Sequence, residues 1–249
     1  MRSSKRTSLP GGEAIYVKHG CLYYGQGQQN TRLIGTRALP ASLGGVAAIN
    51  VANAAAAAAA ALALGIPPRE VAEGLKSFPA GGAGLNRGRL EMLEGADVRV
   101  LVDYGHNVPA ITAMGTICRR LKARTVVTVL GLPGDRRDDD LQASARVVAA
   151  FSDRVVIRED SDRRGRASRE LAELIHQAIQ GEDTTPVEAE IILDEAEAVR
   201  HAILTAPSGA LILVLYEQYD RVRAAAELAL SERKRLSEPE PAEVLLEQA

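Results

Sequence analysis

The feature that most constrains the fold is a repeated alternation of apolar runs and helix-like segments over residues 98–233. Five runs rich in Val, Ile and Leu occur there, and each is followed by a segment in which apolar residues recur at helical spacing. Runs of this kind suit strands that are buried on both faces, and strand–helix alternation produces right-handed crossovers. The pattern predicts an α/β unit with a mostly parallel sheet of Rossmann-like design over residues 84–236.

A different pattern precedes this unit. Residues 13–36 alternate apolar and polar side chains around Gly-containing turns, which predicts a small antiparallel meander. Eight consecutive Ala residues, 54–61, predict a helix, and a second helix with Pro in its first turn follows it. Pro and Gly at 79–88 indicate a linker. We therefore expect a separate unit over residues 1–80, and a flexible tail over residues 237–249 because of its Pro-Glu repeats.

Composition limits the function classes. The chain has 249 residues, with 30 Lys and Arg against 32 Asp and Glu, so its net charge of −2 gives no general attraction to nucleic acid or to an anionic membrane. No apolar run approaches the roughly 20 residues that span a bilayer, and no signal peptide is evident. Cys21 and Cys118 form no metal-ligand or disulfide pattern. We expect a cytoplasmic protein that binds neither nucleic acid nor membranes.

The residues that follow the predicted strands are unusually polar. Open parallel sheets bind ligands at the carboxyl ends of their strands, so these positions form the candidate site. Mixed Arg and carboxylate side chains in one crevice suit a zwitterionic or phosphorylated ligand. The alternative is structural, because Asp103 and Asn107 are also suitable helix caps and "DRRDDD" suits a solvated turn. The polar positions are Asp103, His106, Asn107, Arg136, Asp160, Arg163 and Glu217.

Five segments together carry a family resemblance: "INVANAAAAAAAALALGIPPREVAEGLKSF", "RGRLE", "VDYGHN", "GLPGDRRDDDL" and "EDSDRRGR". The chain resembles the carboxy-terminal third of the Mur ligase superfamily, and within it the cyanophycin-synthetase branch. The resemblance implies a Mur-ligase C-terminal domain over residues 84–236. It also implies that residues 1–80 are the end of the central ATP-binding domain of that family, with a small β meander and two helices.

The resemblance also implies an activity. Mur ligases join an amine to a carboxylate that ATP has first phosphorylated. By resemblance, Asn53 contacts adenine, Arg89 reaches toward the nucleotide, and Asp103 binds the ribose, with His106 and Asn107 beside it. No catalytic base is assigned, since the acceleration in such ligases comes from positioning and charge stabilisation.

The same resemblance implies an amino-acid site. Arg136, Asp160, Arg163 and Glu217 fall on loops that hold the incoming amino acid in Mur ligases. In the cyanophycin-synthetase branch that amino acid is expected to be arginine, which is joined to the aspartate side chains of a cyanophycin-like polymer. The mixed charge suits arginine, whose carboxylate pairs with Arg and whose guanidinium pairs with carboxylates.

One family motif is missing from the sequence. The Gly-rich phosphate loop that ends in Gly-Lys-Ser or Gly-Lys-Thr, and whose hydroxyl holds Mg²⁺, does not occur. We therefore expect no metal ligands in this chain, no activity from the chain alone, and Mg²⁺ and phosphate contacts supplied by other groups, for example by a second polypeptide that carries the phosphate loop.

Two alternatives remain open. The chain is compatible with a non-catalytic binding or regulatory remnant that associates with a full-length synthetase. An ordinary dinucleotide enzyme is disfavoured, because no Gly-x-Gly-x-x-Gly motif follows the first strand of the α/β unit.

Overall fold

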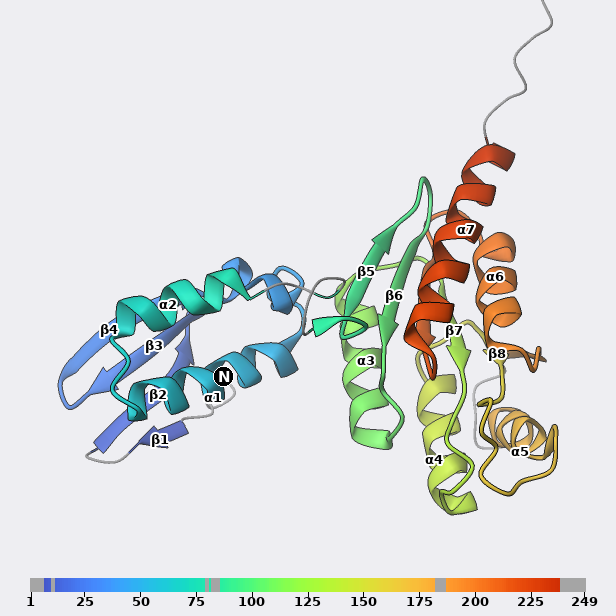
Figure 1. Ribbon diagram of the computed structural model, residues 1–249, viewed down its shortest axis with the longest axis horizontal. Helices are drawn as coiled ribbons and strands as arrows, with labels where there is room; N and C mark the ends of the chain where they lie inside the picture. Colours follow the sequence, from blue (N-terminus) through green and yellow to red (C-terminus); the bar gives the residue numbers. More distant parts are fainter. Residues whose placement is uncertain (1–6, 10–11, 79–80, 82–85, 182–186, 238–249) are drawn as a thin grey trace, which may run out of the picture.

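The computed structural model describes residues 7–9, 12–78, 81, 86–181 and 187–237. In this part of the chain two units lie side by side (Figure 1). We call residues up to Phe78 the N-terminal unit and residues from Asn86 onward the C-terminal unit. Most of the predicted linker at 79–88, and the predicted tail apart from Ser237, lie outside the described residues.

The N-terminal unit contains an antiparallel sheet with the strand order β1-β2-β3-β4. Its strands are β1 (Thr7–Leu9), β2 (Glu13–Lys18), β3 (Cys21–Gln26) and β4 (Gln29–Gly35). The turn between β2 and β3 places His19 and Gly20 in the left-handed region, with φ of 48° and 71°. The meander predicted at residues 13–36 is present, and β1 adds a strand that the sequence did not predict.

Two helices cover one face of this sheet (Figure 1). They are α1 (Ala48–Ala63) and α2 (Pro68–Ser77), and the short 3-10 helices η2 (Thr36–Ala38) and η3 (Pro40–Ser42) lead into them from β4. Ala55, Ala58 and Ala59 of α1 are buried in one cluster with Ile15 and Leu22 of the sheet. The Ala run therefore brings the helix backbone close to the strands, as small side chains allow.

The C-terminal unit is built on a six-stranded sheet with the order β5-β6-β10-β7-β8-β9. All neighbouring pairs are parallel except β5 with β6. The predicted mostly parallel Rossmann-like sheet is confirmed, and the antiparallel edge strand β5 was not predicted. The strands are β5 (Glu91–Glu94), β6 (Arg99–Asp103), β7 (Val126–Leu130), β8 (Arg154–Ile157), β9 (Glu188–Ile191) and β10 (Leu211–Leu215).

Helices cover both faces of this sheet. One apolar cluster joins it to α3, α4 and α5, and a second joins its other face to α6 and α7. Every residue of β7 and β10 is buried, and all of them are apolar except Thr128, whose hydroxyl is hydrogen-bonded to that of Ser152 at 2.7 Å. The helices are α3 (Val108–Arg120), α4 (Asp138–Ala149), α5 (Glu170–Ile179), α6 (Glu195–Thr205) and α7 (Tyr219–Ser237).

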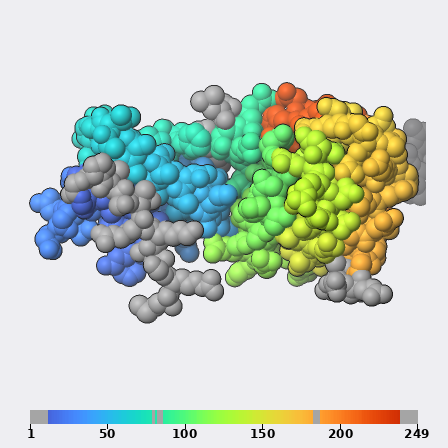
Figure 2. All heavy atoms as spheres, turned by 90° about the horizontal axis from the view of Figure 1, so that it is seen from below, coloured from blue at the N-terminus to red at the C-terminus, as the bar shows by residue number. Residues whose placement is uncertain are grey.

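The two units touch beside α3. Ala47 belongs to the apolar cluster under α3, and Arg120 donates a hydrogen bond of 3.1 Å to the Val46 carbonyl. The space-filling view shows the blue atoms of the N-terminal unit against the green atoms of the C-terminal unit (Figure 2). Both cysteines are free thiols. Among the described helices, none is long and apolar enough to cross a membrane.

Candidate functional site

The carboxyl ends of four neighbouring parallel strands, β6, β10, β7 and β8, lie along one edge of the C-terminal sheet. The loops that leave this edge carry most of the predicted site residues, and three cavities open among them. We call them the junction cavity, the central cavity and the acidic cavity.

The junction cavity has a volume of about 370 Å³ and lies between the two units. It is lined by α1 on one side and by the loop after β6 on the other. All five residues that the resemblance assigned to the nucleotide line it: Asn53, Arg89, Asp103, His106 and Asn107. Ile49, Leu90 and Met114 add apolar surface. The structure therefore brings the whole predicted nucleotide set together in one place.

Asp103 is the buried member of this set. Its carboxylate accepts a hydrogen bond of 3.0 Å from the Leu90 backbone N–H, which fixes the segment that carries Arg89. Burial raises the pKa of Asp103 above its ordinary value, because removal from water disfavours the charged form. The Arg89 guanidinium lies 4.9 Å from the centre of the Tyr104 ring, within the range of a cation–π contact.

The remaining members are held by local contacts. Asn107 caps α3, since its side-chain oxygen accepts a 3.0 Å hydrogen bond from the Ala110 N–H, so the structural alternative for this residue is confirmed. The Nδ1 atom of His106 lies 2.9 Å from the Tyr104 carbonyl, which can only accept, so Nδ1 carries the proton and donates. Nε2 of His106 is therefore an acceptor when the ring is neutral.

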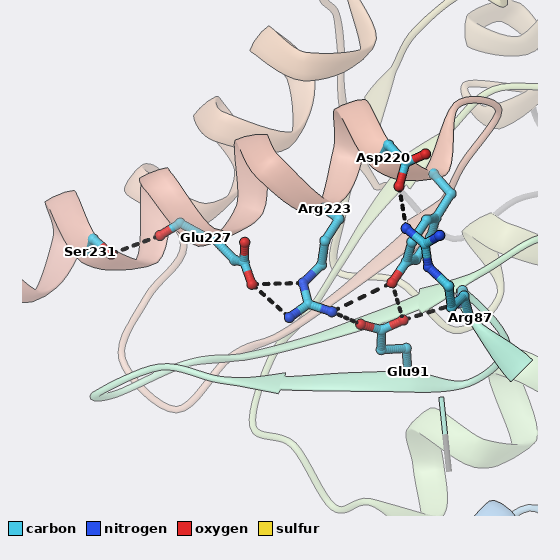
Figure 3. A network of polar contacts seen from close by, with 8 residues as sticks. Arg87, Glu91, Asp220, Arg223, Glu227 and Ser231 are labelled. Atoms are coloured by element: carbon cyan, nitrogen blue, oxygen red, sulfur yellow. Dashed lines mark hydrogen bonds and ion pairs between the residues drawn. The ribbon is translucent and has the colours of Figure 1, made fainter. Parts of the chain in front are cut away.

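A polar network ties the segment before β5 to α7 (Figure 3). At its centre is Glu91, which is only 2% exposed. Glu91 pairs with Arg223, accepts a 2.8 Å hydrogen bond from the Tyr219 hydroxyl and accepts a 3.0 Å hydrogen bond from the Gly88 N–H. Gly88 has φ of +66°, and a Cβ atom there would lie 2.4 Å from the Tyr216 hydroxyl, so only Gly fits. The network therefore fixes the backbone at Gly88, the residue that precedes Arg89.

The central cavity, of about 220 Å³, adjoins the junction cavity, and Tyr104 and His106 line both. Arg136, Asp160 and Glu217, three of the four residues predicted to hold an amino acid, line the central cavity. Arg136 forms no ion pair and no side-chain hydrogen bond with the described residues. Its guanidinium is therefore available to an anionic group.

Arg158 lines the central cavity and is 1% exposed. It pairs with Asp160 and with Glu195, at 3.2 Å, and donates a 2.8 Å hydrogen bond to the Leu215 carbonyl. Gly131 makes room for it, because a Cβ atom at that position would lie 2.2 Å from the guanidinium carbon. Sequence reasoning missed Arg158 and Glu195, because their burial depends on partners far apart in the chain.

The acidic cavity, of about 300 Å³, lies on the other side of Asp160 and Glu217, which line both this cavity and the central one. Arg163, the fourth predicted amino-acid residue, lines the acidic cavity and not the central one. Glu217 accepts hydrogen bonds of 2.7 and 3.0 Å from the backbone and hydroxyl of Ser161. Burial is the main cause of the raised pKa of Asp160, and the Arg158 guanidinium partly opposes it.

The linings of the three cavities combine apolar surface with charged side chains. Within the described ranges, no group of three or more His, Cys, Asp or Glu side chains is arranged to hold a metal ion. The junction cavity offers apolar surface with a few polar groups, as nucleoside sites do, and the central and acidic cavities offer separated positive and negative charges.

Comparisons with known proteins identify the family of the chain. A family model described as "Mur ligase, glutamate ligase domain" matches residues 88–215. Cyanophycin synthetase from Crocosphaera subtropica is 34% identical over 210 residues, which are 84% of this chain and 24% of that protein. The chain therefore spans about a quarter of the length of this curated relative.

Solved structures share the fold. Escherichia coli FolC in complex with ADP is similar with a TM-score of 0.63 and 18% identity, over 89% of this chain and 47% of that chain. The Thermotoga maritima UDP-N-acetylmuramate-alanine ligase MurC is similar with a TM-score of 0.58 and 16% identity, over 94% and 45%. The matching family model and the cyanophycin synthetase relative lead to one conclusion: the chain belongs to the Mur ligase family.

Proposed function

We propose that this chain is the carboxy-terminal, amino-acid-binding part of an ATP-dependent amide ligase of the cyanophycin-synthetase type. The observation that carries the proposal is the adjacency of the junction and central cavities, which share Tyr104 and His106. A nucleotide in the junction cavity and an amino acid in the central cavity would then have their reacting groups near these two shared residues.

The junction cavity suits a nucleoside. Its apolar residues offer contact to a base beside the amide of Asn53, and the carboxylate of Asp103 can accept hydrogen bonds from ribose hydroxyls. Arg89 and His106 line the same cavity and can face the phosphate end. ATP is therefore the proposed co-substrate, in keeping with the ADP bound by the similar FolC structure.

The central and acidic cavities suit an amino acid with a cationic side chain. The guanidiniums of Arg136 and Arg163, which form no ion pair with described residues, offer a partner to a carboxylate. Asp160 and Glu217 offer negative charge between the two cavities. We propose arginine as the incoming amino acid, and aspartate side chains of a cyanophycin-like polymer as the carboxylates to which it is joined.

The chemistry itself requires little of these residues beyond positioning. ATP transfers its terminal phosphoryl group to the acceptor carboxylate, and the amine nitrogen then attacks the carbonyl carbon, forms the C–N bond, loses a proton and expels phosphate. Charge stabilisation of the phosphoryl group contributes most in reactions of this kind. Since the sequence contains no Gly-Lys-Ser or Gly-Lys-Thr loop, we propose that Mg²⁺ and the phosphate contacts come from groups outside this sequence. We place the reaction in the cytoplasm, where ATP is available and free thiols persist.

Nuclear magnetic resonance titrations of the chain with ADP and with arginine test the proposal. We expect the two ligands to shift separate sets of resonances. Asp103→Asn should weaken ADP binding about 10-fold or more and spare arginine, and Glu217→Gln should do the reverse. The control is Asp139→Asn, an exposed residue of α4 outside all three cavities. If neither ligand shifts any resonance, the proposal is wrong.

A second candidate function is favoured by one apolar surface. A cavity of about 470 Å³ opens between α1 and α2, and Ile66 and Phe78 at its edge are 40% and 46% exposed. Such a surface suits a binding or regulatory module that docks on a full-length synthetase. This function is tested by a pull-down with the chain as bait and by an activity assay in which the chain is mixed with a polypeptide that carries the phosphate loop. Recovery of a full-length synthetase in the pull-down, together with no ligase activity in the assay, would favour this function over the first.

A further inference from the structure

The acidic cavity contains more carboxylates than Asp160 and Glu217, the two to which the proposed function gives a role. Five carboxylate residues and two arginines line it: Glu159, Asp160, Asp194, Glu195, Glu217, Arg163 and Arg221. Four of the carboxylates, those of Asp160, Asp194, Glu195 and Glu217, have oxygens engaged by named donors, so the cavity is more than a cluster of like charges. The fifth carboxylate, that of Glu159, has an oxygen to which no described group donates a hydrogen bond.

Glu159 is the second residue after β8, and its backbone N–H donates a 3.1 Å hydrogen bond to the Leu193 carbonyl. The residue is 8% exposed, and its Oε1 atom has no hydrogen-bond partner in the described part of the protein. A carboxylate oxygen withdrawn from water without a donor is costly, and folded proteins rarely leave one so. Because Glu159 lines the acidic cavity, a group bound there is in a position to supply the missing donor.

The neighbouring carboxylates are already satisfied. Asp194 caps α6 through the N–H groups of Ala196 and Glu197 and pairs with Arg221. Glu195 accepts the N–H groups of Glu217 and Gln218, at 2.6 and 3.1 Å. These contacts shape the cavity and leave Glu159 as its recognition group.

The chemistry of the cavity selects the ligand class. A carboxylate oxygen pairs most strongly with a cation that carries N–H donors, and the described residues contain no cluster suited to a metal ion. We propose that Glu159 receives the cationic end of the substrate side chain and thereby sets the specificity of the site for a guanidinium group. The inference rests on the proposed function and deepens it.

The placement of the arginines fits this orientation. Arg163 is exposed, makes no ion pair with described residues and lines the same cavity as the buried Glu159. A substrate carboxylate at Arg163 and a guanidinium at Glu159 would place opposite charges of the ligand against opposite charges of the protein. Asp160 and Glu217, shared with the central cavity, would then face the middle of the ligand.

Calorimetric titration of the full chain with arginine and with citrulline tests the inference. Citrulline has nearly the same shape, and a neutral ureido group replaces the guanidinium. The wild-type protein should bind arginine at least about 10-fold more tightly than citrulline. Glu159→Gln should weaken arginine binding by about 10- to 100-fold and leave citrulline binding within about 3-fold. Glu173→Gln, an exposed carboxylate of α5, is the matched control and should change neither affinity.

Thermal unfolding of the same variants separates recognition from a structural role. Because Oε1 of Glu159 has no partner to lose, Glu159→Gln should unfold at the same or a higher temperature than the wild type. A lower unfolding temperature, or an equal loss of both ligands, would overturn the inference. So would an arginine affinity unchanged by the substitution.

The outcome also distinguishes this inference from the proposal beneath it. If the wild-type chain binds arginine and citrulline equally well, the role of Glu159 is wrong and the amino-acid site stands. If it binds no amino acid at all, the amino-acid site is wrong and the inference falls with it.

Discussion

The two units of this protein differ in how completely they bury their own apolar surface. The C-terminal unit covers both faces of its sheet, with α3, α4 and α5 on one side and α6 and α7 on the other. The N-terminal unit has one apolar cluster between a small sheet and two helices. Two of its large apolar side chains, Ile66 and Phe78, are 40% and 46% exposed and line an apolar cavity.

The difference shows where each unit obtains its stability. A sheet covered on both faces excludes water by itself, and its ligand cavities open only at one edge. A layer with an uncovered apolar side gains further stability only from contact with another surface. The C-terminal unit should therefore respond to substitution as a tightly packed domain, and the N-terminal unit as a more permissive layer.

The largest expected effect is on the C-terminal unit. Arg158→Ala leaves Glu195 and Asp160 buried without their cation, and should lower the free energy of unfolding by about 3–5 kcal/mol in chemical denaturation. The exposed Arg137→Ala, whose partner is Asp139, is the control and should cost less than about 1 kcal/mol. If the units are energetically separate, resonances of Tyr16 and Tyr23 in the N-terminal sheet should not change. A loss below about 1 kcal/mol for Arg158→Ala would contradict the proposed importance of this buried ion group.

A methyl group added to α3 should also destabilise. A Cβ atom at Gly115 would lie 2.4 Å from the Phe151 ring, so Gly115→Ala requires the ring or the helices to move. We expect a loss of about 1–3 kcal/mol in the free energy of unfolding. Restoring space with Gly115→Ala combined with Phe151→Leu should recover part of that loss, and a single variant as stable as the wild type would show that α3 and α4 pack loosely.

The same substitution in the N-terminal unit should have the opposite sign. Gly74 lies within α2, and no atom lies within 4 Å of a Cβ built there. Gly74→Ala should therefore raise the free energy of unfolding of this unit by about 0.5–1 kcal/mol, because Ala favours the helix. The measurement is thermal unfolding followed in the far ultraviolet, and destabilisation by Gly74→Ala would mean that another surface already packs closely there.

Asp103 gives a test that depends on pH. Its folded-state pKa lies above the ordinary aspartate value because the side chain is buried, so the folded protein holds the proton more tightly than the unfolded chain does. The wild type should therefore lose stability relative to Asp103→Asn as the pH rises through the range between the ordinary and the raised pKa, and the difference should be constant above it. Denaturation of both proteins at several pH values measures this, and a gain in wild-type stability relative to Asp103→Asn as the pH rises would have the wrong sign.

The mildest test leaves the sequence unchanged. Cys118 lies buried in α3, and burial raises the pKa of its thiol to about 12, whereas Cys21 in β3 is half-buried. Iodoacetamide at pH 8 should alkylate Cys21 and leave Cys118 unmodified in the folded protein, because the thiolate is the reactive form. Mass spectrometry after digestion reads the two sites separately, the denatured protein serves as the control, and equal labelling of the folded protein would show that the C-terminal unit opens readily.

The strands and helices were predictable because their patterns are local. The five apolar runs and the Ala run each specify an element from neighbouring residues alone. Strand β5 was not predictable, since it has only four residues with Glu91 at one end and Glu94 at the other. Glu91 is buried against Tyr219 and Arg223, which lie on α7, far away in the sequence.

The same limit applies to the site. The resemblance selected five residues that do line one cavity, and the roles of those residues stay predictions. Arg158 follows β8 in a charged segment, so its sequence suggests exposure, and its partners Glu195 and Leu215 are remote. Arg136 and Arg163 were grouped together by the sequence, whereas the structure separates them into adjoining cavities.

The position of β10 has a consequence for the order in which the protein can fold during synthesis. This strand is the last described strand in chain order, yet it lies between β6 and β7 and forms backbone hydrogen bonds with both. While the ribosome is still making the chain, the earlier strands lack their central neighbour and expose unpaired edges, which are prone to aggregation. The N-terminal sheet, whose strands pair with their sequence neighbours, can form first, and the C-terminal sheet can close only when residues 211–215 emerge.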